Sequence, residues 1–434
     1  MGRQAALLLA LGVLALVPPS AGALGVDCEG PAGDPQPGTL AWDQREQNNV
    51  YCGEQRFWDT STNPAFAAAE AENLAHTGQV DMEDPFRDPW RWDGKRFRYQ
   101  EVSLDNGAGD RLPGLLFQPC DGSCHDRPAG LGTYQPPYPG VVIVHGGAAQ
   151  QEMYLWAAEG LAEAGYMVLT FQIPTADNTG GDTHYDNSKA ALEYFLSTPS
   201  RPATGGDVNP AWAQLDRRHV GLAGHSAGGV AVSRLGQEDG RVSAIVSWDR
   251  AQSTPMPADL LLRTPALFFV ADFNCQRVPV CVPEPYTTPP DPEGPGNKGT
   301  DYQRVSAAGI DSMKVALRSA THLDFTQFSP GVGSRYGVSV AFHYTLAWFD
   351  RYLKDGDKKL ARDAVARLTA TRFDGSSDLH NISGGTWDPI GRENLPSRIA
   401  GRPVADRLSF HFRSAYSLNR GRDRCDDMRA GCSP

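Results

Sequence analysis

A serine flanked by glycines is the feature of this sequence that points most directly to chemistry. Residues 224–228 read Gly-His-Ser-Ala-Gly, between an apolar run at 220–223 and an apolar-periodic stretch at 230–235. In a G-x-S-x-G turn between a strand and a helix, the serine hydroxyl projects from the sheet edge, and the glycines allow the turn and the approach of a substrate. We therefore predict that Ser226 is a nucleophile. The alternative is a glycine-rich helix start that Ser226 caps.

A serine hydroxyl needs a base within hydrogen-bond reach. His322 follows a predicted strand at 313–317 over a short loop, at the end of the sheet where Ser226 is expected. His343 lies inside an apolar helical pattern, which is typical of a core residue, and His225 occupies the variable position of the serine motif. We predict that His322 is the base.

An acid is needed to orient the imidazole and to stabilise its positive charge. Two aspartates stand directly after predicted strands: Asp249 after residues 242–248 and Asp272 after residues 265–271. Position alone leaves both open as the catalytic acid. Either side chain can instead serve as a strand-end cap or a surface ion pair.

Acyl transfer also needs N–H donors for an oxyanion. One expected donor is the backbone N–H of Ala227, which follows the serine. The other is expected in the His-Gly-Gly loop after the strand at 141–144, where Gly147 allows close backbone approach. The alternative for that loop is a plain glycine turn.

The substrate pocket is expected beside Ser226, at the carboxyl ends of the neighbouring strands. Trp248 and Phe171 end two of those strands, so we predict that they line the acyl pocket. A core role is an equally good reading of Phe171. The Pro-rich loop at 277–299 is either a rim of the cleft or a surface loop.

The elements that must position these residues follow one order along the chain. An antiparallel hairpin at 97–104 and 112–117 comes first, and strands and helices then alternate. This order predicts an α/β fold with a mostly parallel central sheet and helices on both faces. The expected strands are 141–144, 167–171, 219–223, 242–248, 265–270 and 313–317, and the expected helices are 154–164, 188–196, 302–308 and 338–353.

The N-terminus has the pattern of an export signal. A positive charge at Arg3 precedes an apolar run at 5–17 and an Ala-Gly-Ala site, so cleavage is expected after Ala23. The apolar run is too short to cross a bilayer comfortably, which argues against a membrane anchor. We expect a soluble protein outside the cytoplasm, secreted or periplasmic.

Four segments are expected along the chain. They are a signal peptide at 1–23, an N-terminal extension at 24–95, a catalytic domain at 96–355 and a C-terminal extension at 356–434. Within the last segment, strands are predicted at 364–372 and 407–412. The sequence does not decide whether this extension lies on the core or forms a separate module.

The chain contains eight cysteines, an even number, and an exported protein keeps disulfides. Spacing favours local pairs, although eight cysteines allow 105 pairings. The sequence contains no C-x-x-C pair, which is the spacing that a zinc site would favour. The favoured pairs are Cys28–Cys52, Cys120–Cys124, Cys275–Cys281 and Cys425–Cys432.

The net charge of −11 argues against a nucleic-acid partner. No stretch after the N-terminal signal is apolar and long enough to cross a membrane. The sequence does not indicate an oligomeric state.

Taken with these motifs, residues 97–353 resemble the α/β-hydrolase superfamily, and the best match is to platelet-activating-factor acetylhydrolases and cutinase-like polyesterases. In the acetylhydrolase type, the acid follows the strand after the serine helix, which here is Asp249. In cutinase-like enzymes it follows the next strand, at the position of Asn274, and an amide cannot supply the charge. The resemblance therefore favours Asp249 over Asp272.

These residues and the resemblance together predict a secreted serine hydrolase. It is expected to cleave small or polymeric carboxylic esters through an acyl-enzyme, without a cofactor or a metal ion. A serine peptidase or amidase on the same fold is the main alternative. A fold without catalytic activity that serves binding is the other.

Overall fold

A computed structural model describes the parts of the chain that carry the fold. The described residues are 97–119, 135–174, 181–250, 256–271, 273–275, 283–285, 300–317, 322, 325–326, 335–370, 398–399, 402–403, 414–428 and 432. The predicted signal peptide, the N-terminal extension, the pairs Cys28–Cys52 and Cys120–Cys124, and the predicted strand at 407–412 lie outside these residues. Cys281 and Asp272 also lie outside them.

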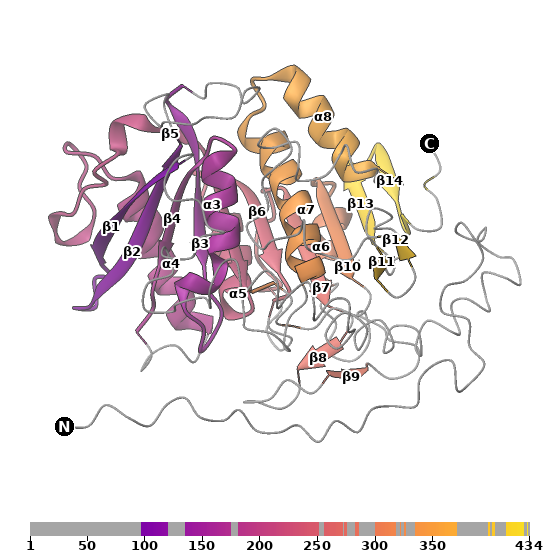
Figure 1. The fold of residues 1–434 in the computed structure, drawn as a ribbon, viewed down its shortest axis with the longest axis horizontal. Coiled ribbons are helices and arrows are strands. Elements are labelled where there is room, and N and C mark those ends of the chain that lie inside the picture. The colour runs from indigo at the N-terminus through magenta and orange to yellow at the C-terminus, as the bar shows by residue number, and fades with distance from the viewer. Residues whose placement is uncertain are drawn as a thin grey trace, which may run out of the picture.

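Strands and helices alternate along the chain after an initial hairpin, as predicted (Figure 1). The strands are β1 Phe97–Asp105, β2 Arg111–Pro119, β3 Tyr138–Val144, β4 Met167–Phe171, β5 Leu215–His225, β6 Val242–Trp248, β7 Ala266–Ala271, β8 Phe273–Cys275, β9 Pro283–Pro285, β10 Ser312–Leu317, β11 Arg398–Ile399, β12 Arg402–Pro403, β13 Ala415–Leu418 and β14 Asp423–Cys425. The α-helices are α3 Leu155–Glu163, α4 Gly181–Leu196, α5 Ala227–Glu238, α6 Thr300–Ala307, α7 Arg335–Leu353 and α8 Lys358–Thr369. Short 3₁₀ turns are η3 Gln151–Tyr154, η4 Thr204–Gly206 and η5 Trp212–Gln214.

A ten-stranded sheet forms the centre of the described part of the chain, in the order β1-β2-β4-β3-β5-β6-β7-β10-β13-β14. The six strands from β4 to β10 are parallel to one another, and the two strands at each edge are antiparallel. From β3 the chain moves outward to β4 and then returns to β5 on the other side of β3. The strand order thus reverses between β3 and β5, and in open α/β sheets ligands bind at the carboxyl ends of the strands at such a point.

Helices cover both faces of the sheet, which explains why its central strands read as continuous apolar runs. In β3, Val141 and Ile143 join the core beneath α3, α7 and α8, whereas Val142 and Val144 join the core beneath α4, α5 and α6. Successive side chains of a strand point to opposite faces, so one apolar run serves both cores. The predicted α/β class with a mostly parallel sheet is confirmed.

The C-terminal region differs from its prediction. Residues 364–372 were expected to form a strand, but α8 occupies Lys358–Thr369. The side chain of Asp357 accepts hydrogen bonds from the N–H groups of Lys359 and Leu360, both at 3.0 Å, and so caps the helix. The buried positions Ala361, Ala364 and Leu368 recur with helical spacing and pack against α7.

Strands β13 and β14 extend the same sheet rather than forming a separate module. Residues 415–417 of β13 pair antiparallel with residues 312–314 of β10, and β14 pairs with β13. A disulfide joins Cys425 to Cys432, with their Cα atoms 4.9 Å apart, as the spacing predicted. The far edge of the sheet is therefore completed by residues about a hundred positions beyond β10.

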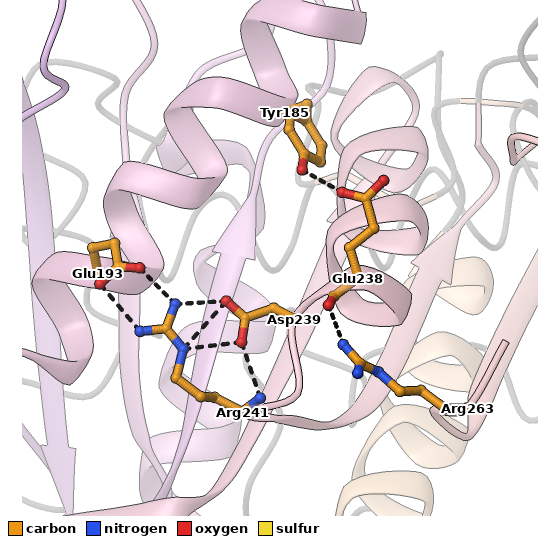
Figure 2. A network of polar contacts seen from close by, with 6 residues as sticks. All are labelled: Tyr185, Glu193, Glu238, Asp239, Arg241 and Arg263. Atoms are coloured by element: carbon orange, nitrogen blue, oxygen red, sulfur yellow. Dashed lines mark hydrogen bonds and ion pairs between the residues drawn. The ribbon is translucent and has the colours of Figure 1, made fainter. Parts of the chain in front are cut away.

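A network of polar side chains joins α4 to the segments that lead into β6 and β7 (Figure 2). Arg241 bonds to Glu193 of α4 at 2.6 Å and to Asp239 at 2.5 Å. Tyr185 of α4 donates to the carboxylate of Glu238, whose backbone oxygen accepts from Arg263. We call these six residues the helix network.

Among the described residues, no helix has the length and apolar character needed to span a bilayer.

Candidate active site

Ser226 stands on a sharp turn between β5 and α5. Its backbone has φ 53° and ψ −118°. Residues other than glycine rarely adopt this backbone conformation, which costs about 1–3 kcal/mol. The Ser226 N–H donates to the oxygen of Trp248 in β6, at 3.2 Å, and its own oxygen accepts from Val230. A Cβ atom at Gly228 would lie 2.4 Å from the oxygen of Val144, so the helix can pack this close to β3 only with glycine there. The predicted turn is thus held by neighbouring strands.

Asp249 follows β6 directly and contacts His322. Its Oδ2 lies 2.5 Å from His322 Nδ1, and its Oδ1 accepts the N–H of Ala271 at 2.9 Å. The aspartate is fully buried, whereas the histidine side chain is 19% exposed. One carboxylate oxygen is thus fixed by β7 and the other orients the imidazole, which leaves Nε2 as the ring nitrogen available for proton transfer.

The three predicted residues gather at one corner of the sheet. The Ser226 N–H donates to the backbone oxygen of Trp248, the residue before Asp249. His225, the residue before Ser226, donates from its ring Nε2 to the backbone oxygen of His322 at 2.7 Å. The hydrogen bonds of these described residues do not include one between Ser226 Oγ and His322 Nε2.

The loop after β3 approaches the serine from the other side. A Cβ atom at Gly146 would lie 3.1 Å from Ser226 Cβ, and Gly147 is exposed beside it. Ala148 has φ 55°, and the N–H of Ala149 closes the turn onto the oxygen of Gly146. Ala227 is the first residue of α5, where backbone N–H groups have no partner within the helix. Of the two predicted oxyanion donors, Ala227 follows Ser226 directly, and Gly147 is the neighbour of a residue that lies against Ser226.

His145 holds that loop in place from the buried side. Its Nδ1 donates to the oxygen of Gly146 at 2.7 Å, and its Nε2 accepts the N–H of Ile173 at 2.9 Å. Burial lowers the pKa of His145 to about 4, so the ring is neutral at physiological pH. A neutral ring with one donor and one acceptor satisfies both contacts.

Trp248 and Phe171, which were predicted to line the acyl pocket, are fully buried in the core. The indole N–H of Trp248 donates to Thr345 of α7 at 3.0 Å, and its ring stacks on Tyr154. Phe171 belongs to the core beneath α4 and α5. In this conformation neither side chain offers a surface to a substrate, so their positions correspond to the core role.

A cavity of about 320 Å³ lies at the opposite end of the sheet, beneath the start of β3 and the end of α7. Tyr138, Asp216, His219 and Asp355 are among its lining residues. It does not include the serine corner. Most of the residues that follow β4, β6 and β10 in the sequence are outside the described residues.

Sequence reasoning missed two polar residues at this corner, Tyr154 and His225. The Tyr154 hydroxyl lies 2.7 Å from His225 Nδ1 and accepts the N–H of Gly146 at 3.2 Å. His225 was read as the variable position of its motif, and Tyr154 as part of an apolar helix. The two residues are 71 positions apart, and no periodic pattern indicates such a contact.

No group of three or more His, Cys, Asp or Glu side chains suited to a metal ion occurs in the described part of the chain. The sequence matches no protein-family model, and no curated protein matches it significantly.

Proposed function

We propose that this protein is a serine hydrolase that cleaves carboxylic esters, with Ser226, His322 and Asp249 as its catalytic triad. The observation that carries the proposal is the bond of a fully buried aspartate to His322 beside a serine held at positive φ. Such a serine turn, followed by an oriented imidazole, is the arrangement that nucleophilic catalysis at neutral pH requires.

In the proposed reaction, Ser226 Oγ attacks the ester carbonyl while His322 Nε2 takes the hydroxyl proton. The N–H groups of Ala227 and Gly147 bind the oxyanion of the tetrahedral intermediate. His322 then protonates the leaving alcohol, and an acyl-serine forms. Water, deprotonated by His322, attacks this acyl-enzyme and releases the acid, which restores Ser226.

We also propose that the fold is an α/β-hydrolase fold. In support, the chain reverses at β3, the serine follows the parallel strand beside it, and the aspartate and histidine follow β6 and β10 in chain order. The order Ser, Asp, His along the sequence is the one expected for that fold.

We also propose that the protein is exported through the signal at 1–23. N-terminal sequencing of the secreted protein tests this.

The decisive experiment is hydrolysis of p-nitrophenyl esters of increasing acyl length by the wild type and by Ser226→Ala. We expect wild-type turnover, and a fall of at least about 10³-fold in kcat for the variant. A fluorophosphonate probe should label the wild type at Ser226 and should not label the variant.

Aminoacyl p-nitroanilides form the second arm of this experiment. Faster turnover of the anilides than of the esters would replace the esterase proposal with a peptidase or amidase on the same triad. A folded wild type that neither hydrolyses any substrate nor reacts with the probe would contradict the hydrolase proposal altogether.

A further inference from the structure

The relay formed by Gly146, Tyr154, His225 and His322 has fixed proton positions. His225 Nε2 donates to a carbonyl oxygen, and in the neutral Nε2–H tautomer its Nδ1 accepts from the Tyr154 hydroxyl. The phenol oxygen in turn accepts the N–H of Gly146. Burial raises the pKa of Tyr154 well above its ordinary value, which keeps this donor protonated. The relay thus fits a single, neutral tautomer of His225.

This relay joins the two loops that the proposed reaction must align. Gly146 belongs to the loop that carries the oxyanion donor Gly147, and His322 belongs to the segment after β10 that carries the base. Tyr154, at the end of η3, is fully buried and contacts both partners through one oxygen atom. A shift of either loop would therefore break a hydrogen bond of this relay.

His322 is held on the backbone side by this relay and on the ring side by Asp249. The segment has a second backbone anchor nearby, because Trp156 Nε1 of α3 donates to the oxygen of Phe325 at 3.2 Å. His322 is thus held by two contacts, one at its backbone oxygen and one at its ring Nδ1, which restrict the direction of the imidazole more than the Asp249 bond alone.

We propose that Tyr154 and His225 are positioning residues that align the base His322 with the oxyanion loop through this relay. The inference rests on the proposed function, since the alignment matters only if His322 takes a proton from Ser226. His225 of the serine motif thus has a positioning role in addition to its place in the turn.

The neutral state of His225 has an electrostatic consequence. Its ring centroid lies 4.6 Å from that of His322, which becomes an imidazolium during the proposed reaction. A positive charge on His225 would oppose this change, because like charges at that distance disfavour the charged form. The hydroxyl of Tyr154 occupies Nδ1 as a donor and so favours the uncharged ring.

Tyr154→Phe tests the proposal with the smallest change, since it removes only the hydroxyl and keeps the ring that stacks on Trp248. We expect kcat for p-nitrophenyl esters to fall roughly 10- to 100-fold with KM within about twofold, because misaligned catalytic groups lower the rate of the chemical step. The matched control is Tyr166→Phe, which also removes a hydroxyl from a fully buried tyrosine. This hydroxyl donates to Asp350 over 2.8 Å and takes no part in the relay. The control variant should lower thermal stability and leave kcat unchanged.

Rescue separates positioning from packing. His225→Leu should lose activity as Tyr154→Phe does, whereas His225→Gln keeps an N–H donor near the Nε2 position and should recover a large part of kcat. Tyr154→Phe combined with His225→Leu should be little worse than either change alone, since both break one relay.

Two results would overturn the inference. One is a wild-type kcat in Tyr154→Phe and His225→Leu when both are folded and labelled at Ser226 by the fluorophosphonate probe. The other is an equal loss of kcat in Tyr166→Phe, which would trace the effect to stability. If the wild type itself is neither active nor labelled, the proposed function fails first and takes this inference with it.

Discussion

Two polar clusters of this molecule differ in how far their ionisable side chains are exposed to water. In the serine corner, Asp249 is fully buried and His322 is 19% exposed. In the helix network, Arg241 and Glu193 are 41% and 45% exposed, although their contact is as short as 2.6 Å (Figure 2). Distance alone therefore does not rank these interactions.

The two clusters differ in whether water can hydrate a side chain that has lost its partner. Exposed ion pairs contribute about 0–1 kcal/mol, because solvent screens them and the free side chains are well hydrated. A buried carboxylate whose two oxygens are assigned to one backbone N–H and one imidazole has no such substitute. We expect the serine corner to be sensitive to single atoms and the helix network to tolerate whole side chains.

Asp249→Asn should have the largest effect. The amide oxygen can still accept the N–H of Ala271, so the fold should persist, but an NH₂ group facing His322 favours the wrong tautomer. We expect kcat to fall about 10⁴-fold. Ester hydrolysis and circular dichroism of the same preparation measure the two properties.

Asp272→Asn is the control for that substitution. It should retain turnover, because the bond to His322 comes from Asp249. If Asp272→Asn abolishes hydrolysis while Asp249→Asn stays active, the acid has been assigned to the wrong strand end.

Gly146→Ala should have an intermediate effect. The new Cβ atom would lie 3.1 Å from both Ser226 Cβ and His225 Nδ1, so the neighbours must move by a few tenths of an ångström. We expect a roughly 10- to 100-fold lower kcat/KM for esters, since small displacements of reacting groups are costly. Gly356→Ala, where a Cβ meets nothing within 4 Å, is the matched control and should be silent. Full activity of Gly146→Ala would show that the corner is less tightly aligned than we infer.

Arg241→Ala tests the helix network. It removes the contacts to Glu193 and Asp239 at once, yet we expect a loss of no more than about 1 kcal/mol in the free energy of unfolding and no change in ester hydrolysis. Urea denaturation with and without added salt measures this. A loss of several kcal/mol would contradict the ranking by exposure.

Asp239→Asn should give the smallest effect, and one that depends on pH. Burial raises the pKa of Asp239, but the hydrogen bonds and charge of Arg241 outweigh it and hold the pKa below the ordinary value of 3.8. A carboxylate with a lowered folded-state pKa stabilises the fold above its unfolded pKa and loses this contribution as pH falls through the folded value. The wild type should therefore exceed the variant in stability at neutral pH, and the difference should shrink as the pH falls below 3.8 toward the lowered folded-state pKa. A stability difference that grows toward acid pH would have the wrong sign.

The sequence predicted the buried strands best. The bounds of β4 and β6 agree with their prediction, because a strand covered on both faces is a continuous apolar run that ends where polar residues begin. The positions of Ser226, Asp249 and His322 followed from the same logic, since each comes directly after such a run or a short loop beyond it.

The predictions failed where long-range contacts decide the structure. Residues 364–372 were predicted as a strand, but the cap at Asp357 and the packing of α8 against α7 stabilise a helix at Lys358–Thr369. The relay through Tyr154 and His225 joins residues that the sequence keeps far apart, and Trp248 was placed in the pocket because its strand end was visible and its stacking on Tyr154 was not.

The pairing of β13 with β10 has a consequence for biosynthesis. Ser414 Oγ accepts the N–H of Ala316 in β10 from 98 positions further along the chain. Until that late segment leaves the ribosome, β10 has an open edge with unpaired backbone groups, a few residues before His322 in the sequence. The nascent chain must therefore shield this edge from other chains over the time in which nearly a hundred further residues are made.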